Sequence, residues 1–158
     1  FNLSNCGMYA MDTMRMEKGY LHWGHDITPE ENQYEAGLRF AISYKKNVDF
    51  IGKEALLKIK EQKPKKKLVI LSLKDNKPGF PLLLHDEPIL YDDIIVGRTT
   101  SGNYSFNFNK NLAFGYVSIN KSEDLKGNKF EIEIEKIRYK ASIEHHPLFD
   151  PKNSYLKS

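Results

Sequence analysis

The sequence has very little of several features that usually reveal where a protein works. Only one of its 158 residues, Cys6, is a cysteine, so no disulfide can form within the chain. This fits a reducing compartment, and we expect the cytoplasm, or the mitochondrial matrix in a eukaryote. No apolar run approaches the roughly 20 residues of a membrane-spanning helix, and the start lacks a signal-peptide pattern. We therefore expect no membrane partner. Because the chain starts at Phe1 rather than methionine, we also expect a fragment of a longer protein.

The chain also lacks a strong charge of either sign. It carries 24 basic and 21 acidic residues, for a formal charge of +3. The one basic cluster, KPKKK at residues 63–67, is interrupted by Pro64 and lies between two periodic segments. These features favour a solvated linker over a phosphate-binding patch, and we expect no nucleic-acid partner.

The common catalytic and binding motifs are missing as well. Without a GxGxxG turn or a Walker loop, the sequence has no recognisable site for a dinucleotide or a nucleoside triphosphate. Ser101 does not lie in a GxSxG elbow, and nothing marks Cys6, in a helix start that looks buried, as a thiolate. We predict no catalytic residue and no metal site in this chain. No cysteine pair or HExxH helix accompanies the histidines, so we expect surface or interface positions for His22, His25, His145 and His146.

The first 62 residues have mixed periodicity. A helix is predicted from residue 5 to about 18, with Ser4 or Asn5 as its N-cap and Gly19 as a left-handed stop. This helix is apolar nearly all round, which is typical of a buried helix. An irregular connection over 20–34 and an alternating strand, LRFAISY, over 38–44 should follow. An amphipathic helix is predicted over 52–62, with its apolar stripe at Ala55, Leu56 and Ile59.

After the lysine-rich segment at 62–67 the pattern changes to short strands separated by turn residues. Strands are predicted at 68–73 and 111–119, and strict alternation begins at Phe130. About six such strands in sequence suggest a small antiparallel barrel. We therefore predict an α+β fold with a domain boundary between residues 62 and 63.

Glu17 is the most informative polar residue, because it lies among methionines and aromatic residues. A carboxylate is rarely buried unless it is paired. Its partner could be Arg15, Arg39 or a backbone N–H, which would make a structural ion pair or cap. Alternatively, its two oxygens could bind a flat ligand that presents two parallel N–H donors. Aromatic walls for such a ligand would come from Tyr9, Tyr20 and Trp23.

Several motifs together resemble the C-terminal part of the glycine-cleavage T-protein (aminomethyltransferase) family. They occur in the family's order: MDTMRMEKGYLHWGHDITPEENQYEAGLRFAI, KNVDFIGKEALLKIK, VGRTTSGNYSFNFNKNLAFGYV and HHPLFDPKN. Within the family they look most like the C-terminal, folate-binding portion of dimethylglycine and sarcosine dehydrogenases. The resemblance implies that residues 1–62 are the remnant of a folate-binding domain and that residues 63–158 form the family's C-terminal barrel.

The resemblance also implies roles for individual residues. Glu17, in the R-x-E-x-G stretch, would hold the pterin ring of tetrahydrofolate. Tyr9, or Ala10 at the seven-residue spacing, would line the pterin pocket, and Tyr20 and Trp23 are candidates for its walls. Basic residues after the EAGL motif would lie near the glutamate tail of folate, and this place is occupied by Lys45 and Lys46.

The implied activity belongs to a larger enzyme. Its FAD, which this chain does not bind, would oxidise an N-methyl amine, and tetrahydrofolate would capture the one-carbon unit as 5,10-methylenetetrahydrofolate. The family's catalytic aspartate has no match here, so we expect the chain alone to be inactive and its partners to be upstream folate and flavin domains of the same polypeptide. Alternatives are a glycine-cleavage aminomethyltransferase, another folate-dependent demethylase, and a non-catalytic regulatory or scaffold relative.

Overall fold

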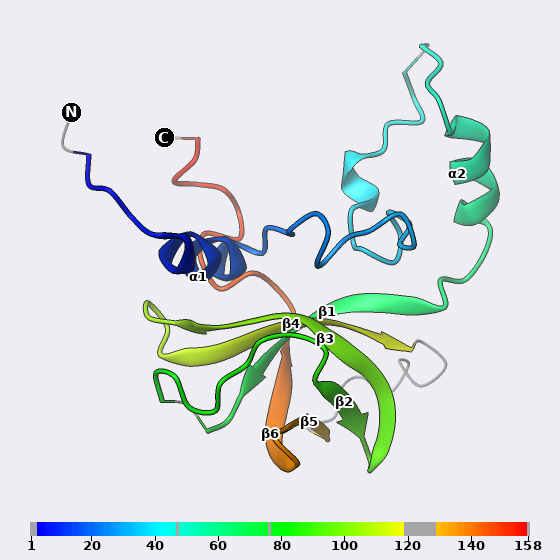
Figure 1. Ribbon diagram of the computed structural model, residues 1–158. Helices are drawn as coiled ribbons and strands as arrows, with labels where there is room; N and C mark the ends of the chain where they lie inside the picture. Colours follow the sequence, from blue (N-terminus) through cyan, green and yellow to red (C-terminus); the bar gives the residue numbers. More distant parts are fainter. Residues whose placement is uncertain (1–2, 47, 76, 119–128, 158) are drawn as a thin grey trace.

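A computed structural model describes residues 3–46, 48–75, 77–118 and 129–157. Two helices and a short 3-10 helix precede six strands, which close into an antiparallel barrel (Figure 1). Helix α1 lies against the barrel, whereas α2 stands away from it. The elements are α1 (Met8–Lys18), η1 (Arg39–Ala41), α2 (Lys53–Lys60), β1 (Lys66–Leu73), β2 (Pro88–Tyr91), β3 (Ile94–Ser105), β4 (Lys110–Ser118), β5 (Phe130–Ile134) and β6 (Ile137–Glu144).

The barrel confirms the predicted fold class. Its strand order is β1-β4-β3-β2-β5-β6, and β1 pairs with β6 to close it. The hairpins β2–β3 and β5–β6 turn through Asp92-Asp93 and Glu135-Lys136, all at positive φ, which suits tight two-residue turns. The strands predicted at 68–73, 111–119 and from Phe130 correspond to β1, β4 and β5. Ile119, the last residue of the predicted strand 111–119, lies outside the described residues.

Alternation along the strands creates two cores. One set of side chains fills the barrel, including Leu71, Ile89, Phe130 and Ile132. On β4 the opposite face is apolar too, because Leu112 and Phe114 pack outside the barrel against α1. The second core is completed by Met16 of α1 and by the partly buried Leu21, Leu68, Ile70 and Leu148. A strand that is buried on both faces therefore anchors the N-terminal helix.

Helix α1 differs in two ways from its prediction. It begins at Met8 with Gly7 as the N-cap, so the predicted cap at Ser4 or Asn5 is wrong, and Cys6 is exposed rather than buried. Only Thr13, Met16 and Glu17 are buried, because the barrel covers a single face of the helix. The stop at Gly19 is confirmed by its φ of 75°. The apolar side chains of this helix that remain exposed are Met8, Tyr9, Met11 and Met14.

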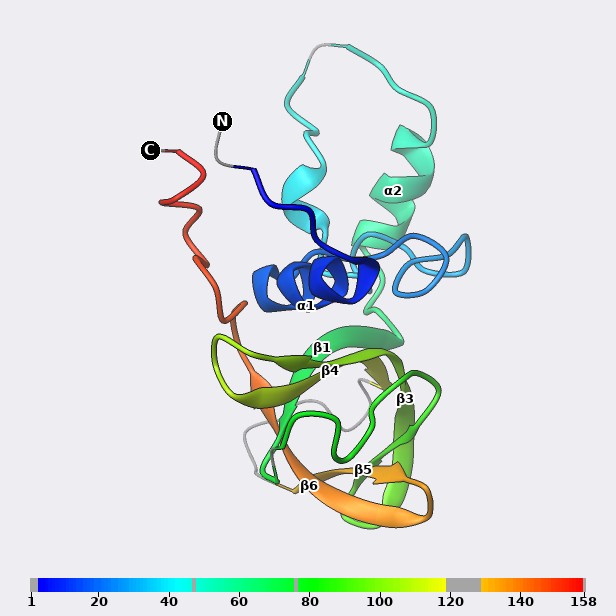
Figure 2. The same ribbon diagram turned by 60° about the vertical axis from the view of Figure 1, so that its left-hand side comes forward.

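The C-terminal segment runs beside α1 and fixes its end (Figure 2). The N–H of Phe149 donates to the backbone oxygen of Glu17 at 2.9 Å. The Lys18 ammonium group contacts a carboxylate oxygen of Asp150 at 3.1 Å. A Cβ atom at Gly19 would lie 2.6 Å from a ring carbon of Pro147, so this close approach requires glycine there.

The connection from α1 to β1 is mostly irregular. The strand predicted over 38–44 is wrong, because these residues include the 3-10 turn η1 and Phe40 is 84% exposed. An alternating sequence becomes a strand only where a neighbouring strand can pair with it. Helix α2 confirms the helix predicted over 52–62 with shorter bounds, and its Leu56 and Ile59 are only partly buried. None of the helices in the described ranges is long and apolar enough to span a bilayer.

Candidate functional site

Glu17 is buried at the junction of α1 and the barrel, with a 2% exposed fraction. Its Oε1 accepts a hydrogen bond from the Ser105 hydroxyl at 2.7 Å and another from the Asn107 backbone N–H at 3.3 Å. Its Oε2 accepts one from the Asn107 side-chain amide at 2.6 Å. Within the described part of the chain, neither Arg15 nor Arg39 contacts this carboxylate. The partners of Glu17 therefore come from the end of β3 and the turn before β4.

A cavity of about 470 Å³ opens beside this carboxylate, between α1 and the β3–β4 hairpin. Its walls are mostly apolar or aromatic, and its polar side chains come from Thr13, Glu17, Asn103 and Asn107. This combination suits a flat heterocycle whose edge carries N–H donors, such as a pterin ring. The lining residues are Tyr9, Ala10, Thr13, Met14, Glu17, Gly79, Asn103, Tyr104, Phe106 and Asn107.

The structure brings only part of the predicted site together. Tyr9 and Glu17 line the same cavity, and so does Ala10, the alternative to Tyr9. Within the described chain, this cavity does not include Tyr20 or Trp23, which are 53% and 68% exposed.

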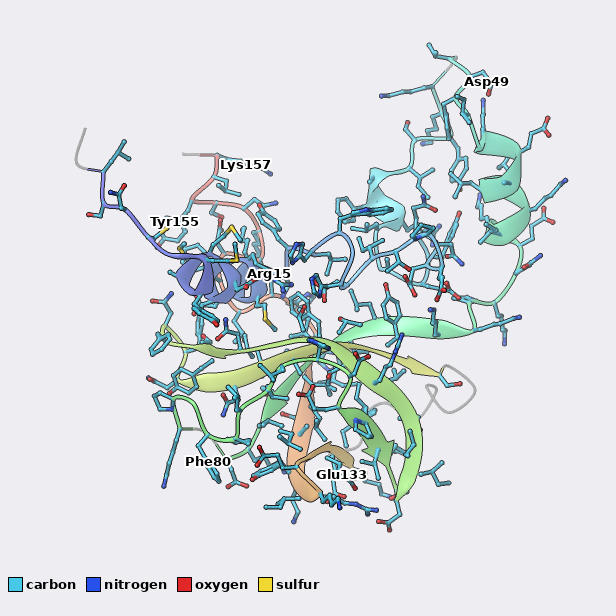
Figure 3. All side chains as sticks on the ribbon, viewed as in Figure 1. Arg15, Asp49, Phe80, Glu133, Tyr155 and Lys157 are labelled. Carbon is cyan, nitrogen blue, oxygen red and sulfur yellow. The ribbon has the colours of Figure 1, made fainter. Side chains whose placement is uncertain are left out.

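The two predicted lysines lie elsewhere. Lys45 and Lys46 are exposed in the loop that leads to Asp49, which Figure 3 shows far from Arg15 of α1. Among the described residues, neither lysine lines the cavity beside Glu17. Their proposed contact with a folate tail stays a prediction.

Sequence reasoning missed the contribution of the β3–β4 turn. The turn is at 106–109, and the glycine-containing stretch 98–102 lies within β3 instead. Gly102 has a different role, because a Cβ atom there would lie 2.5 Å from the Cβ of Leu83. The asparagines of SFNFNK are a turn signal that could have located the hairpin correctly.

A second buried carboxylate, Asp26, fixes the loop that follows α1. Its Oδ2 accepts hydrogen bonds from the Arg15 guanidinium at 2.5 Å and from the backbone N–H of His22 at 2.9 Å. Its Oδ1 accepts from the hydroxyls of Thr100 and Ser101 at 2.6 and 2.7 Å. Arg15 also pairs with Asp12 of the same helix, at 3.2 Å. The ion pairs of Arg15 with Asp26 and Asp12 direct its side chain away from Glu17.

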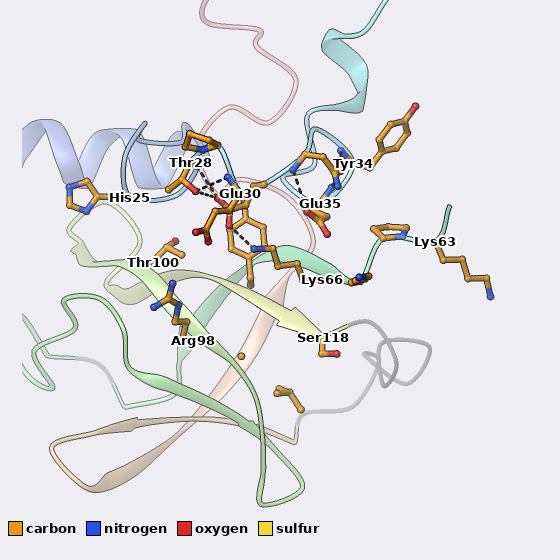
Figure 4. Close-up of a pocket in the computed structure, with 18 of the residues that line it drawn as sticks. His25, Thr28, Glu30, Tyr34, Glu35, Lys63, Lys66, Arg98, Thr100 and Ser118 are labelled. Atoms are coloured by element: carbon orange, nitrogen blue, oxygen red, sulfur yellow. Dashed lines mark hydrogen bonds and ion pairs between the residues drawn. The ribbon is translucent and has the colours of Figure 1, made fainter. Parts of the chain in front are cut away.

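A larger cleft, of about 1280 Å³, separates residues 25–35 and 62–66 from the barrel (Figure 4). Across this cleft, the Glu31 carboxylate forms an ion pair with the Lys66 ammonium group at 2.5 Å. Burial alone would raise the pKa of Glu31, but hydrogen bonds from Lys66 and Thr28 more than offset this and lower it. Burial, together with nearby carboxylates including Glu31, raises the pKa of Tyr116, whose phenol therefore stays protonated and donates to the backbone oxygen of Asp26.

Three of the histidines lie close together. The rings of His22 and His25 have centroids 4.7 Å apart, and His85 lies 6.3 Å from His25. Over the ranges that the structure describes, no group of three or more histidine, cysteine or acidic residues is arranged to hold a metal ion.

Comparison with known families shows to which family the chain belongs. A model of the glycine cleavage T-protein C-terminal barrel domain matches residues 66–150, and a model of the GCVT N-terminal domain matches residues 1–46. This chain belongs to the glycine cleavage T-protein family. The two matches lie on either side of the boundary predicted between residues 62 and 63, which itself stays a prediction.

Individual relatives of this T-protein family chain are enzymes. A 4-methylaminobutanoate oxidase (formaldehyde-forming) of Paenarthrobacter nicotinovorans is 39% identical over 98% of the chain. The mitochondrial dimethylglycine dehydrogenase of Homo sapiens is 40% identical over 92% of it. Other relatives are named sarcosine dehydrogenase and aminomethyltransferase.

The chain matches only a part of each of these proteins. It spans 18% of the oxidase and 16% of the human dehydrogenase. The fold is shared with a crystal structure of the aminomethyltransferase of Bartonella henselae, with a TM-score of 0.76 and 23% identity over 90% of this chain and 38% of that one.

Proposed function

We propose that this chain is the C-terminal, tetrahydrofolate-binding portion of an enzyme like dimethylglycine or sarcosine dehydrogenase. The observation that carries the proposal is the buried Glu17 carboxylate on the wall of a largely apolar cavity. The high identity to an N-methyl amine oxidase and a dimethylglycine dehydrogenase supports the substrate class, an N-methylated amine.

The residues of the cavity fit the pterin end of the cofactor. Glu17 would accept hydrogen bonds from the amino and ring N–H donors of the pterin, and Tyr9 and Phe106 would cover its faces. Bound tetrahydrofolate supplies the N5 and N10 amines that take up the one-carbon unit to give 5,10-methylenetetrahydrofolate. The task of this chain is then to hold the pterin in one orientation and to keep water from the reacting carbon.

Other parts of the proposed enzyme would come from upstream domains of the same polypeptide, which would supply the catalytic aspartate and the FAD. Consistent with this, the segment 40–57 carries several exposed apolar side chains. The most exposed is Ile51, and the others are Phe40, Val48, Phe50 and Leu57. A surface of this kind marks a contact with another protein region. On its own, the chain would be inactive.

The test is a titration of the intact protein with folinic acid, a stable tetrahydrofolate analogue, comparing wild type with Glu17→Gln. Loss of a charge-assisted hydrogen bond should weaken binding by about 1.5–3 kcal/mol, which is about tenfold or more. Glu30→Gln is the matched control, because Glu30 is exposed and lies at the other cleft. Unchanged affinity in Glu17→Gln would contradict the pterin contact and favour a non-catalytic relative, and a lowered thermal midpoint with unchanged affinity would make Glu17 a structural residue.

A second candidate function is that of an aminomethyltransferase, favoured by the family match over the barrel and the first 46 residues. The two functions differ in their chemistry, since only the dehydrogenase oxidises its substrate. Visible absorbance of bound flavin in the intact protein, together with N-methyl amine oxidation, would support the first. Folate-dependent transfer from a lipoyl-bound aminomethyl group without a flavin would support the second.

The name of the oxidase relative also suggests which reaction product to measure. That protein is named as formaldehyde-forming, whereas the proposed function delivers the carbon to tetrahydrofolate. We expect the intact protein to release less free formaldehyde when tetrahydrofolate is present, with methylenetetrahydrofolate appearing instead.

A further inference from the structure

Asn107 contacts Glu17 in the way that the proposed ligand would. Its backbone N–H donates to Oε1 and its side-chain amide donates to Oε2, so a single residue places one N–H donor on each carboxylate oxygen. The edge of a pterin presents the same pair of donors. The internal contact and the proposed ligand contact therefore compete for the same two oxygens.

The number of acceptor sites makes this competition unavoidable. A carboxylate oxygen has two lone pairs, and Oε1 of Glu17 already accepts two hydrogen bonds. A ligand with paired N–H donors needs a site on each oxygen, so one present donor must leave Oε1. The Asn107 N–H, at 3.3 Å, makes a longer bond than the Ser105 hydroxyl, at 2.7 Å.

The surroundings distinguish these two donors further. Ser105 is the last residue of β3, is 1% exposed, and its hydroxyl also accepts the N–H of Phe108. Asn107 is exposed and lies in the turn beyond the final pair of the β3–β4 ladder, Ser105 with Lys110. A turn outside the ladder can move at lower cost than the strand that carries it.

We propose that Asn107 is an exchangeable partner of Glu17, which occupies the place of the ligand's paired N–H donors and leaves it when the ligand binds. Ser105 stays in both states and keeps the carboxylate oriented. This inference rests on the proposed function for the identity of the ligand, tetrahydrofolate. It makes Asn107 a specificity-determining residue, since a ligand with one N–H donor cannot replace both of its contacts.

The exchange reduces apparent affinity, because only molecules in which Asn107 has moved away can bind. Asn107→Ala removes the contact between the side-chain amide and Glu17, which is the stronger of the two contacts that Asn107 makes. We therefore expect folinic acid to bind the intact protein about three- to tenfold more tightly. Asn5→Ala is the matched control: Asn5 is exposed and does not line this cavity, so affinity should change by less than about twofold. Ser105→Ala should weaken binding.

Weaker or unchanged binding in Asn107→Ala would overturn the proposal, and weaker binding would make Asn107 a residue that positions Glu17. Amide hydrogen exchange of wild type tests the same point without a substitution. Folinic acid should speed exchange at residues 106–109, whereas slower exchange there would contradict the inference. The proposed function fails separately, because it requires weaker binding in Glu17→Gln whatever the result at Asn107.

Discussion

The barrel and the first 60 residues are held in place by different forces. The barrel encloses an apolar core in which Leu71, Ile89 and Ile132 are fully buried. Among the described residues of the N-terminal segment, the buried side chains are mostly polar: Thr13, Glu17, Asp26 and Glu35, beside Met16 and Ala36.

Three of these four polar side chains bond directly to the barrel. Thr13 donates to the backbone oxygen of Tyr104, Glu17 accepts from the β3–β4 hairpin, and Asp26 accepts from Thr100 and Ser101. Hydrogen bonds have strict geometry, whereas apolar contacts do not. Apolar burial therefore stabilises the barrel, and the polar contacts determine where α1 and the following loop lie on it. The candidate site is formed at this polar junction.

From this comparison of the barrel with the N-terminal segment, we expect the largest loss of stability for a substitution in the barrel core. Phe130→Ala should lower the free energy of unfolding by about 3–5 kcal/mol, because it removes a buried ring and leaves a cavity. Ile51→Ala, at a fully exposed apolar position, should cost less than about 0.5 kcal/mol. Chemical denaturation of both variants of the intact protein measures the contrast. An equal loss at Ile51 would break the comparison and show that another region covers it.

A smaller loss is expected at the polar junction. Asp26→Asn should cost about 1.5–3 kcal/mol, because it weakens charge-assisted bonds from Arg15 and turns an amide toward the hydroxyls of Thr100 and Ser101. Asp12→Asn removes the charge of another partner of Arg15, which is part-exposed, and should cost about 0.5 kcal/mol. Unfolding and limited proteolysis of the loop at 20–35 report both effects. Equal losses would mean that burial does not set the strength of these contacts.

The smallest expected effect depends on pH. The lowered pKa of Glu31 means that its contribution to stability is present above its ordinary pKa of 4.5 and is lost as the pH falls through the lowered value. Glu31→Gln should therefore be less stable than wild type by up to about 1 kcal/mol near pH 7, and the difference should shrink as the pH falls below 4.5 and through the lowered pKa. Glu54→Gln in α2 is the exposed control. A difference that is constant across this range would contradict the electrostatic explanation.

Sequence patterns located β1, β4 and β5 but failed in the N-terminal segment. These strands were predictable because their apolar side chains face the barrel interior or α1. The same alternation over 38–44 was misleading, because Phe40 has no neighbouring strand in the described chain. The apolar circumference of α1 suggested full burial, but only one of its faces is covered by the barrel.

For the candidate site, the sequence singled out Glu17 but not its partners. The carboxylate was conspicuous because it interrupts an apolar helix, which is a local feature. Ser105 and Asn107 are 88 and 90 residues away, and only the closing of the barrel brings them to Glu17. No periodicity within α1 or the hairpin contains that information.

The sequence by itself therefore determined the strands β1, β4 and β5, the end of α1 at Gly19 and the family. Each of these depends on local periodicity, on one residue's backbone preference or on motifs read in order. The tertiary structure decided which face of α1 is buried, which residues bind the carboxylates of Glu17 and Asp26, and where a cavity opens beside Glu17. Hydrogen bonds between distant segments require a geometry that forms only when the barrel brings those segments together.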